Sequence, residues 1–224
     1  MDRIAAIKAY IEELFGFESD ILKQVRLRSL ANAIPQIHVP AHVLQLIKVI
    51  IQLKKPKRIL EIGTLAGYSA IGIASVMPKD CHLYTIEINP DHVQMAQENV
   101  IAAGFGKQVT IIFGDAHEVI QQWLKERVEK FDMVFIDGNK ESYGAYLSFI
   151  KPLLNDEAVL VTDNLIPKWK DILDPHPKDM MAKAIYSFNQ QLSQDPQLMT
   201  AVTTTVVGNS PRIDALGISI FHPR

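Results

Sequence analysis

The feature that most constrains the fold is a regular alternation of short apolar runs and helical patterns through the middle of the chain. The segments between the runs, including residues 141–154, carry apolar residues at helical spacing. The runs themselves have the length and apolar content of strands covered on both faces, at residues 58–63, 82–88, 109–115, 131–137 and 158–163. Because the connections are short, this alternation predicts a parallel sheet with right-handed crossovers, a doubly wound α/β fold.

Both ends of the chain depart from this alternation. Three helices are predicted before the first strand, at residues 3–15, at residues 20–33 and in the segment after Pro40. Near the other end, residues 178–194 predict a helix. The runs "MTAVTTTVV" and "ALGISIF" that follow are separated only by a turn, so they predict an antiparallel hairpin.

Length and composition indicate one globular domain. With 224 residues, of which 48% are hydrophobic and 21% charged, the chain has enough apolar material for one well-covered core. We expect a single domain over residues 1–224. In it, residues 1–55 cover the site and offer a candidate dimer surface, and residues 56–224 form the core.

Charge and cysteine content exclude several classes of protein. The formal net charge of −2 gives no overall excess of positive charge for binding a nucleic-acid backbone. Cys81 is the only cysteine, so an intrachain disulfide and Cys-rich zinc sites are excluded. The stretch "MDRIAAIKAYIEELFG" is too rich in charged residues for a signal-peptide core or a membrane span. We therefore expect a cytoplasmic protein with no membrane partner.

A glycine-containing turn follows the first predicted strand. "LEIGTLAGYS" places Gly63 and Gly67 where the polar end of a ligand can approach backbone N–H groups at a helix start. The spacing differs from G-x-G-x-x-G, which counts against a pyrophosphate cradle and an NAD-dependent oxidoreductase. Glu61, just before the turn, suits a ligand's ammonium group better than a phosphate.

Acidic residues also end the next two predicted strands. Glu87 can accept hydrogen bonds from both hydroxyls of a ribose, and Asp115 and Ala116 lie where an adenine is expected. Since the carboxyl ends of parallel strands share one edge of a sheet, these residues predict a nucleoside site there.

Oxygen-donor side chains follow the fourth and fifth predicted strands. Asp137 ends the fourth, and Asp163 with Asn164 ends the fifth. Two carboxylates and one amide, with no histidine or thiolate among them, favour a hard cation such as Mg²⁺ over zinc. Lys140 follows Asp137 by three residues, so it is expected beside the same site.

These motifs carry a resemblance to a known family. From about Val39 onward, through "EIGTLAGYS", "IEINP", "GDAHEVI", "FIDGNKESY" and "TDN", the chain resembles the cation-dependent O-methyltransferases of the catechol and caffeoyl-CoA type, particularly their small bacterial members. The resemblance implies the Rossmann-like fold of class I S-adenosylmethionine-dependent methyltransferases. That fold has a mostly parallel seven-stranded sheet, a C-terminal antiparallel hairpin and extra N-terminal helices.

The resemblance also implies an activity and its partners. The methyl donor is S-adenosylmethionine, the cofactor is Mg²⁺ or another hard divalent cation such as Mn²⁺ or Ca²⁺, and the acceptor is a hydroxyl of a small catechol-like molecule. The enzyme is expected to be a homodimer. A tryptophan that follows the Asp-Asn pair closely in relatives stands here at Trp169, which implies a rearranged substrate wall.

Residue roles follow from the resemblance by position. Asp137, Asp163 and Asn164 hold the cation, and Lys140 lies beside the reacting hydroxyl, where it takes the proton or, if it stays charged, stabilises the oxyanion. Ser69 bonds the donor's carboxylate. The positions that surround the methyl donor correspond to Val39, Glu61, Ser69, Glu87, Ala116 and Asp137.

Two alternatives stay open. Some bacterial relatives methylate a hydroxylated uridine in tRNA, and Lys23, Arg26 and Arg28 could supply the phosphate contacts for such a substrate. A binding protein that keeps the S-adenosylmethionine pocket without turnover is the alternative from another class. The intact set of Asp137, Lys140, Asp163 and Asn164 argues against it.

Overall fold

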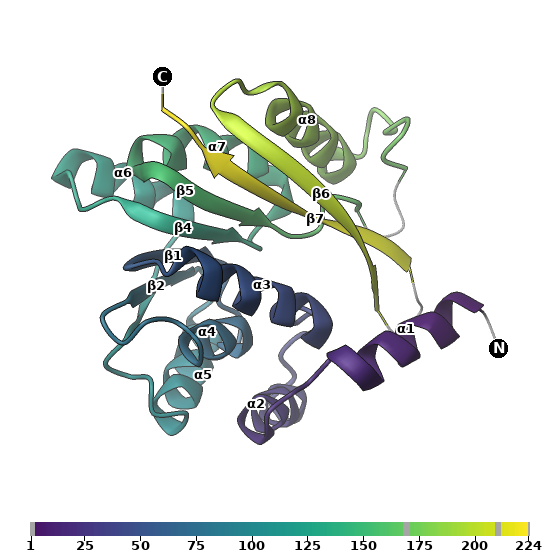
Figure 1. Ribbon diagram of the computed structural model, residues 1–224, viewed down its shortest axis with the longest axis vertical. Coiled ribbons are helices and arrows are strands. Elements are labelled where there is room, and N and C mark those ends of the chain that lie inside the picture. The colour runs from purple at the N-terminus through teal and green to yellow at the C-terminus, as the bar shows by residue number, and fades with distance from the viewer. Residues whose placement is uncertain (1–2, 168–170, 209–211, 224) are drawn as a thin grey trace. The chain divides into compact units, whose positions relative to one another are not determined.

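Figure 1 shows the computed structural model of the chain, which describes residues 3–167, 171–208 and 212–223. The chain divides into two compact units, Met1–Asp115 and Ala116–Arg224. Within the described residues, no helix is both long enough and apolar enough to span a membrane.

The first unit is built on three parallel strands in the order β3-β2-β1. Ile59, Leu60 and Leu83 have no exposed surface, which explains why these strands read as continuous apolar runs. The elements of this unit are α1 (Arg3–Phe15), α2 (Asp20–Ala31), α3 (Ala41–Lys54), β1 (Arg58–Ile62), α4 (Tyr68–Ala74), β2 (His82–Glu87), α5 (Pro90–Ala102) and β3 (Val109–Phe113). The three predicted N-terminal helices and the first three predicted strands are confirmed, with ends that differ by at most two residues.

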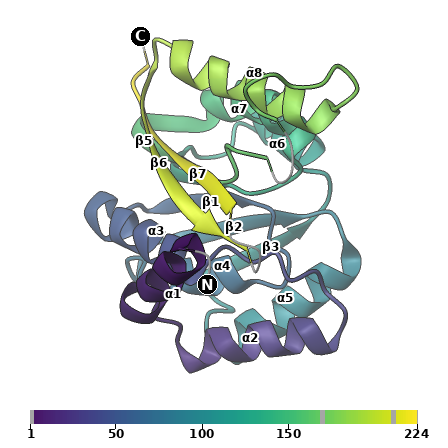
Figure 2. The same cartoon turned by 90° about the vertical axis from the view of Figure 1, so that its right-hand side faces the viewer.

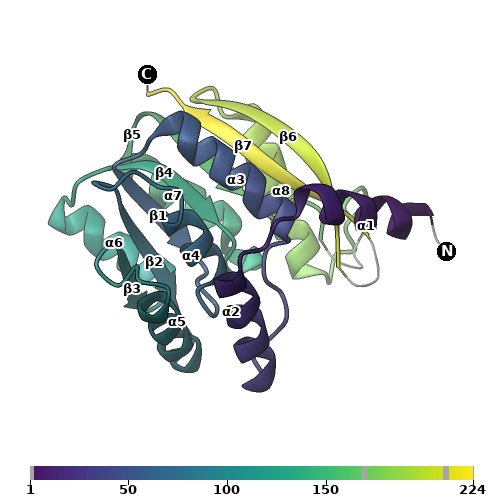
Figure 3. The ribbon, with the colours of Figure 1, turned by 60° about the horizontal axis from the view of Figure 1, so that its bottom comes forward.

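The helices of the first unit pack on one another as well as on the strands. α1 contacts α3, and α2 contacts α4 (Figure 3). A Cβ atom on Gly72 of α4 would lie 2.6 Å from a methyl group of Leu44 on α3, so glycine permits this close approach. α1 itself buries none of its residues, and Ile4, Ile7, Tyr10, Leu14 and Phe15 are exposed.

The described residues of the second unit form four strands in the order β4-β5-β7-β6, of which β4 and β5 are parallel and β7 and β6 run antiparallel to their neighbours. α7 and α8 pack side by side in this unit (Figure 2). Its elements are α6 (Ala116–Glu126), β4 (Phe131–Ile136), η1 (Lys140–Ser142), α7 (Tyr143–Ile150), η2 (Lys151–Leu153), β5 (Leu154–Thr162), α8 (Met180–Gln194), β6 (Leu198–Val207) and β7 (Arg212–Phe221). The predicted hairpin is therefore confirmed as β6 and β7.

One predicted helix is wrong in its extent. The segment 141–154 forms a short α-helix between two 3₁₀ turns, and β5 begins at Leu154 instead of residue 158. Pro152 has no N–H to donate, and its ring is incompatible with a helix interior, so the regular helix ends before it. The helical pattern continued past the residue that stops the helix.

The register of β4 and β5 fixes where the second unit places its polar residues. Ile136 pairs with Thr162, the last residue of each strand. Asp137 and Asp163 are therefore the first residues beyond two adjacent strand ends. The backbone N–H of Asp163 also donates to the carbonyl of Ile136 at 3.0 Å.

Candidate active site

The turn between β1 and α4 has a backbone that depends on glycine. Gly63 and Gly67 have φ angles of 98° and 83°, in the left-handed region that glycine adopts without strain. A Cβ atom on Gly67 would also lie 3.4 Å from Ala96 on α5. Gly67 donates its N–H to the carbonyl of Thr64 at 2.9 Å. These contacts fix the turn that leads into Tyr68 and Ser69 at the start of α4.

Glu87, the last residue of β2, holds two turns of the first unit together. Its Oε2 accepts a hydrogen bond from the N–H of Leu65 at 2.8 Å, and its Oε1 accepts one from the N–H of Asn89 at 3.0 Å. Each oxygen of a carboxylate can accept more than one hydrogen bond. The carboxylate is thereby oriented by the backbone and keeps acceptor capacity for a ligand.

Glu61 lies deeper than Glu87. Its side chain is fully buried, and its Oε2 accepts a hydrogen bond from the hydroxyl of Thr85, its register partner on β2, at 2.6 Å. The hydroxyl of Thr85 also bonds to that of Thr64 in the β1–α4 turn. Glu61 is thus part of the network under the turn, and its contact with a ligand's ammonium stays a prediction.

The other predicted donor-binding residues of the first unit are placed by the same elements. Ser69 lies in the first turn of α4, Val39 is buried just before α3, and Asp115 follows β3 and is half-buried. In the second unit, Ala116 is buried at the start of α6. Residues 61–69, Glu87 and Asp115 thus all lie at or just beyond the carboxyl ends of the three parallel strands.

A polar cluster at the start of α4 was not predicted from the sequence. The hydroxyl of Tyr68 donates to Glu18 at 2.9 Å, and Arg26 donates to both carboxylate oxygens of Glu18. The ring of His38 lies 5.2 Å from that of Tyr68. Burial, with a smaller contribution from Arg26, lowers the pKa of His38 to about 4, so this histidine is neutral near physiological pH.

The predicted cation ligands all come from the second unit. Asp163 is 3% exposed, and its Oδ1 accepts the N–H of Asn164 at 2.9 Å. Asn164 has a φ of 58°, a left-handed conformation that asparagine tolerates better than most residues. The hydroxyl of Tyr143 donates to the carbonyl of Asp163 at 3.0 Å. The backbone at the end of β5 is therefore held on both sides of Asp163.

Lys140 is placed beside the first predicted ligand. Its Nζ lies 2.6 Å from Oδ1 of Asp137, and it also lies 5.4 Å from the centre of the Tyr143 ring. Asn139 precedes it and caps the short 3₁₀ turn by accepting the N–H of Glu141. The i,i+3 spacing seen in the sequence thus produces a partly buried ion pair.

Carboxyl groups are crowded at the ends of β4 and β5. Burial raises the pKa of Asp137, and Lys140 offsets part of that rise. Burial and the nearby carboxylates of Asp137 and Asp214 raise the pKa of Asp163 to about 8. A divalent cation would relieve this repulsion, and two carboxylates with an amide are ligands that suit a hard cation. The residues present therefore fit a Mg²⁺-type ion.

Within the described residues, no three His, Cys, Asp or Glu side chains lie together in a position to hold a metal. The predicted set contains only two carboxylates and completes its ligands with an amide. Asp214, the third carboxylate near this end, was not predicted from the sequence. It is fully buried near the start of β7 and accepts a hydrogen bond from the side-chain amide of Asn164.

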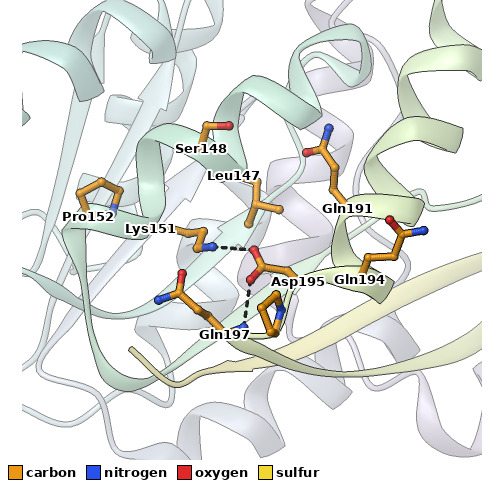
Figure 4. Close-up of a pocket in the computed structure, with 9 residues that line it drawn as sticks. Leu147, Ser148, Lys151, Pro152, Gln191, Gln194, Asp195 and Gln197 are labelled. Atoms are coloured by element: carbon orange, nitrogen blue, oxygen red, sulfur yellow. Dashed lines mark hydrogen bonds and ion pairs between the residues drawn. The ribbon is translucent and has the colours of Figure 1, made fainter. Parts of the chain in front are cut away.

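A separate pocket of about 630 Å³ lies in the second unit beside the ends of α7 and α8 (Figure 4). Lys151 and Asp195 form an ion pair there at 2.5 Å, and Asp195 also accepts the N–H of Gln197 at 3.0 Å. Because its two charged side chains pair with each other, this pocket offers little free charge to a ligand. None of the predicted site residues lines it.

The basic residues considered for a tRNA substrate are each paired with a carboxylate. Lys23 pairs with Asp20, Arg26 with Glu18 and Arg28 with Glu98, at 3.2, 2.7 and 2.8 Å. Trp169, the residue considered for the substrate wall, lies outside the described residues.

The fold and the site define the class of the protein. Residues 12–209 match the model of a family described as O-methyltransferase, and the chain belongs to that family. The matched region includes every predicted donor, cation and catalytic residue. The predicted class of enzyme is thereby confirmed.

Individual relatives support the same class. A catechol O-methyltransferase of Niastella koreensis is 36% identical over 203 residues, which cover 90% of this chain and 89% of that protein. An O-methyltransferase from Bacillus cereus, solved in complex with SAH, has a TM-score of 0.89 at 25% identity and covers 96% of this chain and 97% of its own. The O-methyltransferase TomG from Streptomyces achromogenes, solved with SAM, has a TM-score of 0.89 at 26% identity over 100% of both chains. These likenesses confirm the predicted class I methyltransferase fold with its seven strands and antiparallel C-terminal hairpin.

Proposed function

We propose that this O-methyltransferase uses S-adenosylmethionine and a hard divalent cation, Mg²⁺ above all, to methylate one hydroxyl of a small aromatic ortho-diol. The observation that carries the proposal is the placement of Asp137, Asp163 and Asn164 beyond two adjacent strand ends, with Lys140 paired to Asp137. Carboxylate and amide oxygens beside a lysine suit both a hard cation and an acidic hydroxyl.

The comparisons support the proposed donor and acceptor. Solved structures similar to this chain contain SAM or SAH, and the relative from Niastella koreensis is named for catechol. The first unit of this chain supports a nucleoside donor by its own geometry. Glu87 presents an oriented carboxylate, and the β1–α4 turn presents backbone close to the start of a helix.

Asp137, Asp163 and Asn164 would hold the cation. When bound, the ion supplies positive charge that favours loss of a proton from an acceptor hydroxyl and offsets the crowded carboxylates. Tyr143 keeps the backbone of Asp163 in place through its hydroxyl. The ligand set is therefore organised by the protein before any ion binds.

Lys140 is the candidate for handling the hydroxyl proton. In the structure its Nζ donates to Asp137, so it can accept a proton only after giving one up. If it gives one up, it takes the proton of the acceptor hydroxyl, and if it stays charged, it stabilises the resulting anion. The acceptor oxygen then bonds to the methyl carbon while the carbon–sulfur bond breaks, which leaves a methyl ether and a neutral thioether.

An acceptor screen with methyl-labelled donor tests the proposal. Simple catechols, caffeoyl esters, flavonoids and tRNA carrying 5-hydroxyuridine would each be assayed with Mg²⁺ and with excess EDTA. We expect transfer to an ortho-diphenol that EDTA abolishes and Mg²⁺ restores. Full activity in a verified metal-free preparation would exclude the cation-dependent mechanism.

The tRNA arm of the screen addresses the alternative acceptor. The ion pairs of Lys23, Arg26 and Arg28 reduce the positive charge that these residues offer to phosphates, which favours the small acceptor. Methylation of the tRNA that falls steeply with salt, without turnover of any catechol, would reverse this preference.

We also propose that the enzyme is a homodimer that uses the exposed face of α1. Ile7, Leu14 and Phe15 on this helix are 46%, 55% and 63% exposed, and none of its residues is buried. A second copy of the chain would cover these apolar groups. Light scattering after size exclusion should give a dimer for the wild type and a monomer for Ile7→Lys/Leu14→Lys. A monomeric wild type would refute this part of the proposal.

A further inference from the structure

Asp214 is a buried carboxylate that the mechanism above does not use. The antiparallel pairing of β5 with β7 brings the start of β7 beside the residues that follow β5, and Leu165 donates its N–H to the carbonyl of Ala215 at 3.0 Å. Asp214 has no exposed surface. It therefore lies against the segment that carries Asn164.

Both oxygens of this carboxylate accept hydrogen bonds. Oδ1 accepts the N–H groups of Ala215 and Ile166 at 2.7 and 3.2 Å. Oδ2 accepts the side-chain amide of Asn164 at 3.0 Å and lies 2.8 Å from a guanidinium nitrogen of Arg212. A buried charge is costly unless it is paired and hydrogen-bonded, and Arg212 with three N–H donors satisfies that condition.

The hydrogen bond between Asn164 and Asp214 fixes which atom of the Asn164 amide faces Asp214. A side-chain amide has one oxygen that accepts and one nitrogen that donates, whereas an ionised carboxylate only accepts. Asn164 must therefore turn its nitrogen toward Asp214. The side-chain oxygen of Asn164 then points away from Asp214, and only this oxygen can serve as a ligand of a hard cation.

We propose that Asp214 is a positioning residue that turns the amide of Asn164 so that its oxygen faces the cation, while Arg212 balances the buried charge. This inference rests on the proposed cation dependence. It assigns Asp214 no contact with the ion, the donor or the acceptor. Asn164, the proposed cation ligand, is thus oriented by a residue 50 positions away in the sequence.

The variant Asp214→Asn reverses the direction of the contact. The N–H groups of Ala215 and Ile166 hold its oxygen at the Oδ1 position, so its amide nitrogen takes the Oδ2 position, where it faces Asn164 and displaces Arg212. Asn164 then meets it with its oxygen and turns its nitrogen toward the cation, where a nitrogen that carries two hydrogens cannot bind. Changes to groups that orient a metal ligand typically weaken metal affinity about 10- to 100-fold.

Mn²⁺ is the probe for the first test, and free Mn²⁺ is measured by electron paramagnetic resonance. Asp132→Asn is the matched control, because Asp132 also accepts an Asn side-chain amide, that of Asn155 at 2.7 Å, at the opposite end of β4. We expect Asp214→Asn to raise the Kd for Mn²⁺ at least 10-fold, and Asp132→Asn to leave it within about 2-fold. The Kd for S-adenosylhomocysteine should stay close to the wild type in both variants. Asp214→Asn should melt at a lower temperature than the wild type, because Arg212 loses its carboxylate partner.

A double-mutant cycle separates positioning from a general effect of charge. If Asp214 acts through Asn164, Asp214→Asn should change the Kd for Mn²⁺ less than about 3-fold when Asn164 is already Ala. An equal loss in both backgrounds would overturn the inference, and so would an unchanged Kd in the single variant. If the wild type itself fails to bind Mn²⁺ at millimolar concentration, the proposed cation dependence fails as well.

A measurement on the metal-free wild type keeps the inference testable even if Asp214→Asn does not fold. The side-chain amide of Asn164 would be observed by NMR in protein labelled with ¹⁵N-asparagine and identified by its absence in Asn164→Ala. A hydrogen bond to a buried carboxylate should move one of the two amide protons downfield of its free-asparagine shift and slow its exchange with solvent. A rapidly exchanging amide at free-asparagine shifts would overturn the proposed contact without bearing on the cation itself.

Discussion

Acid should destabilise the protein through His38. The ring packs against Tyr68, and its Nε2 is buried without a hydrogen-bond partner within the described part of the chain. Burial is the main cause that lowers the pKa of His38 from 6.5 to about 4, and the positive charge of Arg26 acts in the same direction. Protonation would place a charge on a ring whose Nε2 is buried without a partner, and the carboxylate of Glu18 offsets only part of that cost.

The size of the effect follows from the two pKa values. As the pH falls below 6.5, the unfolded chain takes up a proton at His38 that the folded protein refuses until the pH approaches 4. The contribution of neutral His38 to the free energy of unfolding is therefore fully present above pH 6.5 and is lost as the pH falls toward 4. Between pH 7 and pH 5 the free energy of unfolding should fall by about 2 kcal/mol through His38 alone.

Urea unfolding followed by circular dichroism at pH 7, 6 and 5 measures this loss. His38→Phe keeps a ring against Tyr68 but cannot titrate, so its stability should fall by about 2 kcal/mol less than that of the wild type over this range. Burial lowers the pKa of His42 and His82 as well, and the comparison of the two proteins cancels their contribution. The exposed His222→Gln serves as control. Parallel pH dependences for the wild type and His38→Phe would refute the reasoning.

Three further predictions concern the predicted cation residues of the second unit and the predicted donor residues of the first. Because burial and neighbouring carboxylates raise the pKa of Asp163 to about 8, the metal-free protein should lose stability as the pH rises from 6.5 to 8, and Asp163→Asn should remove that loss in melts with EDTA. Lys140→Ala should lower kcat at least about 100-fold with little change in the Kd for S-adenosylhomocysteine, as single-turnover kinetics and calorimetry would establish. Glu87→Gln should weaken S-adenosylhomocysteine binding at least about 10-fold in calorimetry, because the amide replaces one acceptor by a donor that faces a backbone N–H.

Much of the fold could be predicted because its signals are local. The buried strands read as apolar runs, and the residues that end them, such as Glu87 and Asp137, were recognisable as candidates from their place after each run. The exception lies in the second unit, where the apolar spacing of a predicted helix continues past Pro152, a residue that cannot continue a helix.

The parts of the site that were missed depend on contacts between distant segments. Asp214 meets Asn164 only because β7 returns antiparallel beside β5, and Glu18 meets Tyr68 across 50 positions of sequence. Periodicity reports which face of an element is buried, but it does not report which residue of another element lies opposite. Neither acid stands at the end of a predicted strand, so neither was singled out.

The way Glu87 is held also bears on which nucleosides the first unit can accept. Each of its oxygens already receives one backbone N–H, from Leu65 and from Asn89, and Oε1 also lies 3.6 Å from Nδ1 of His92. A carboxylate oxygen can accept more than one hydrogen bond, so each keeps capacity for a hydroxyl. Two neighbouring hydroxyls on one sugar would fill both of these places together. With the donor's ribose bound at Glu87 as proposed, a 2′-deoxy or 3′-deoxy analogue would leave one of them empty, and this single side chain would favour ribonucleosides over deoxynucleosides.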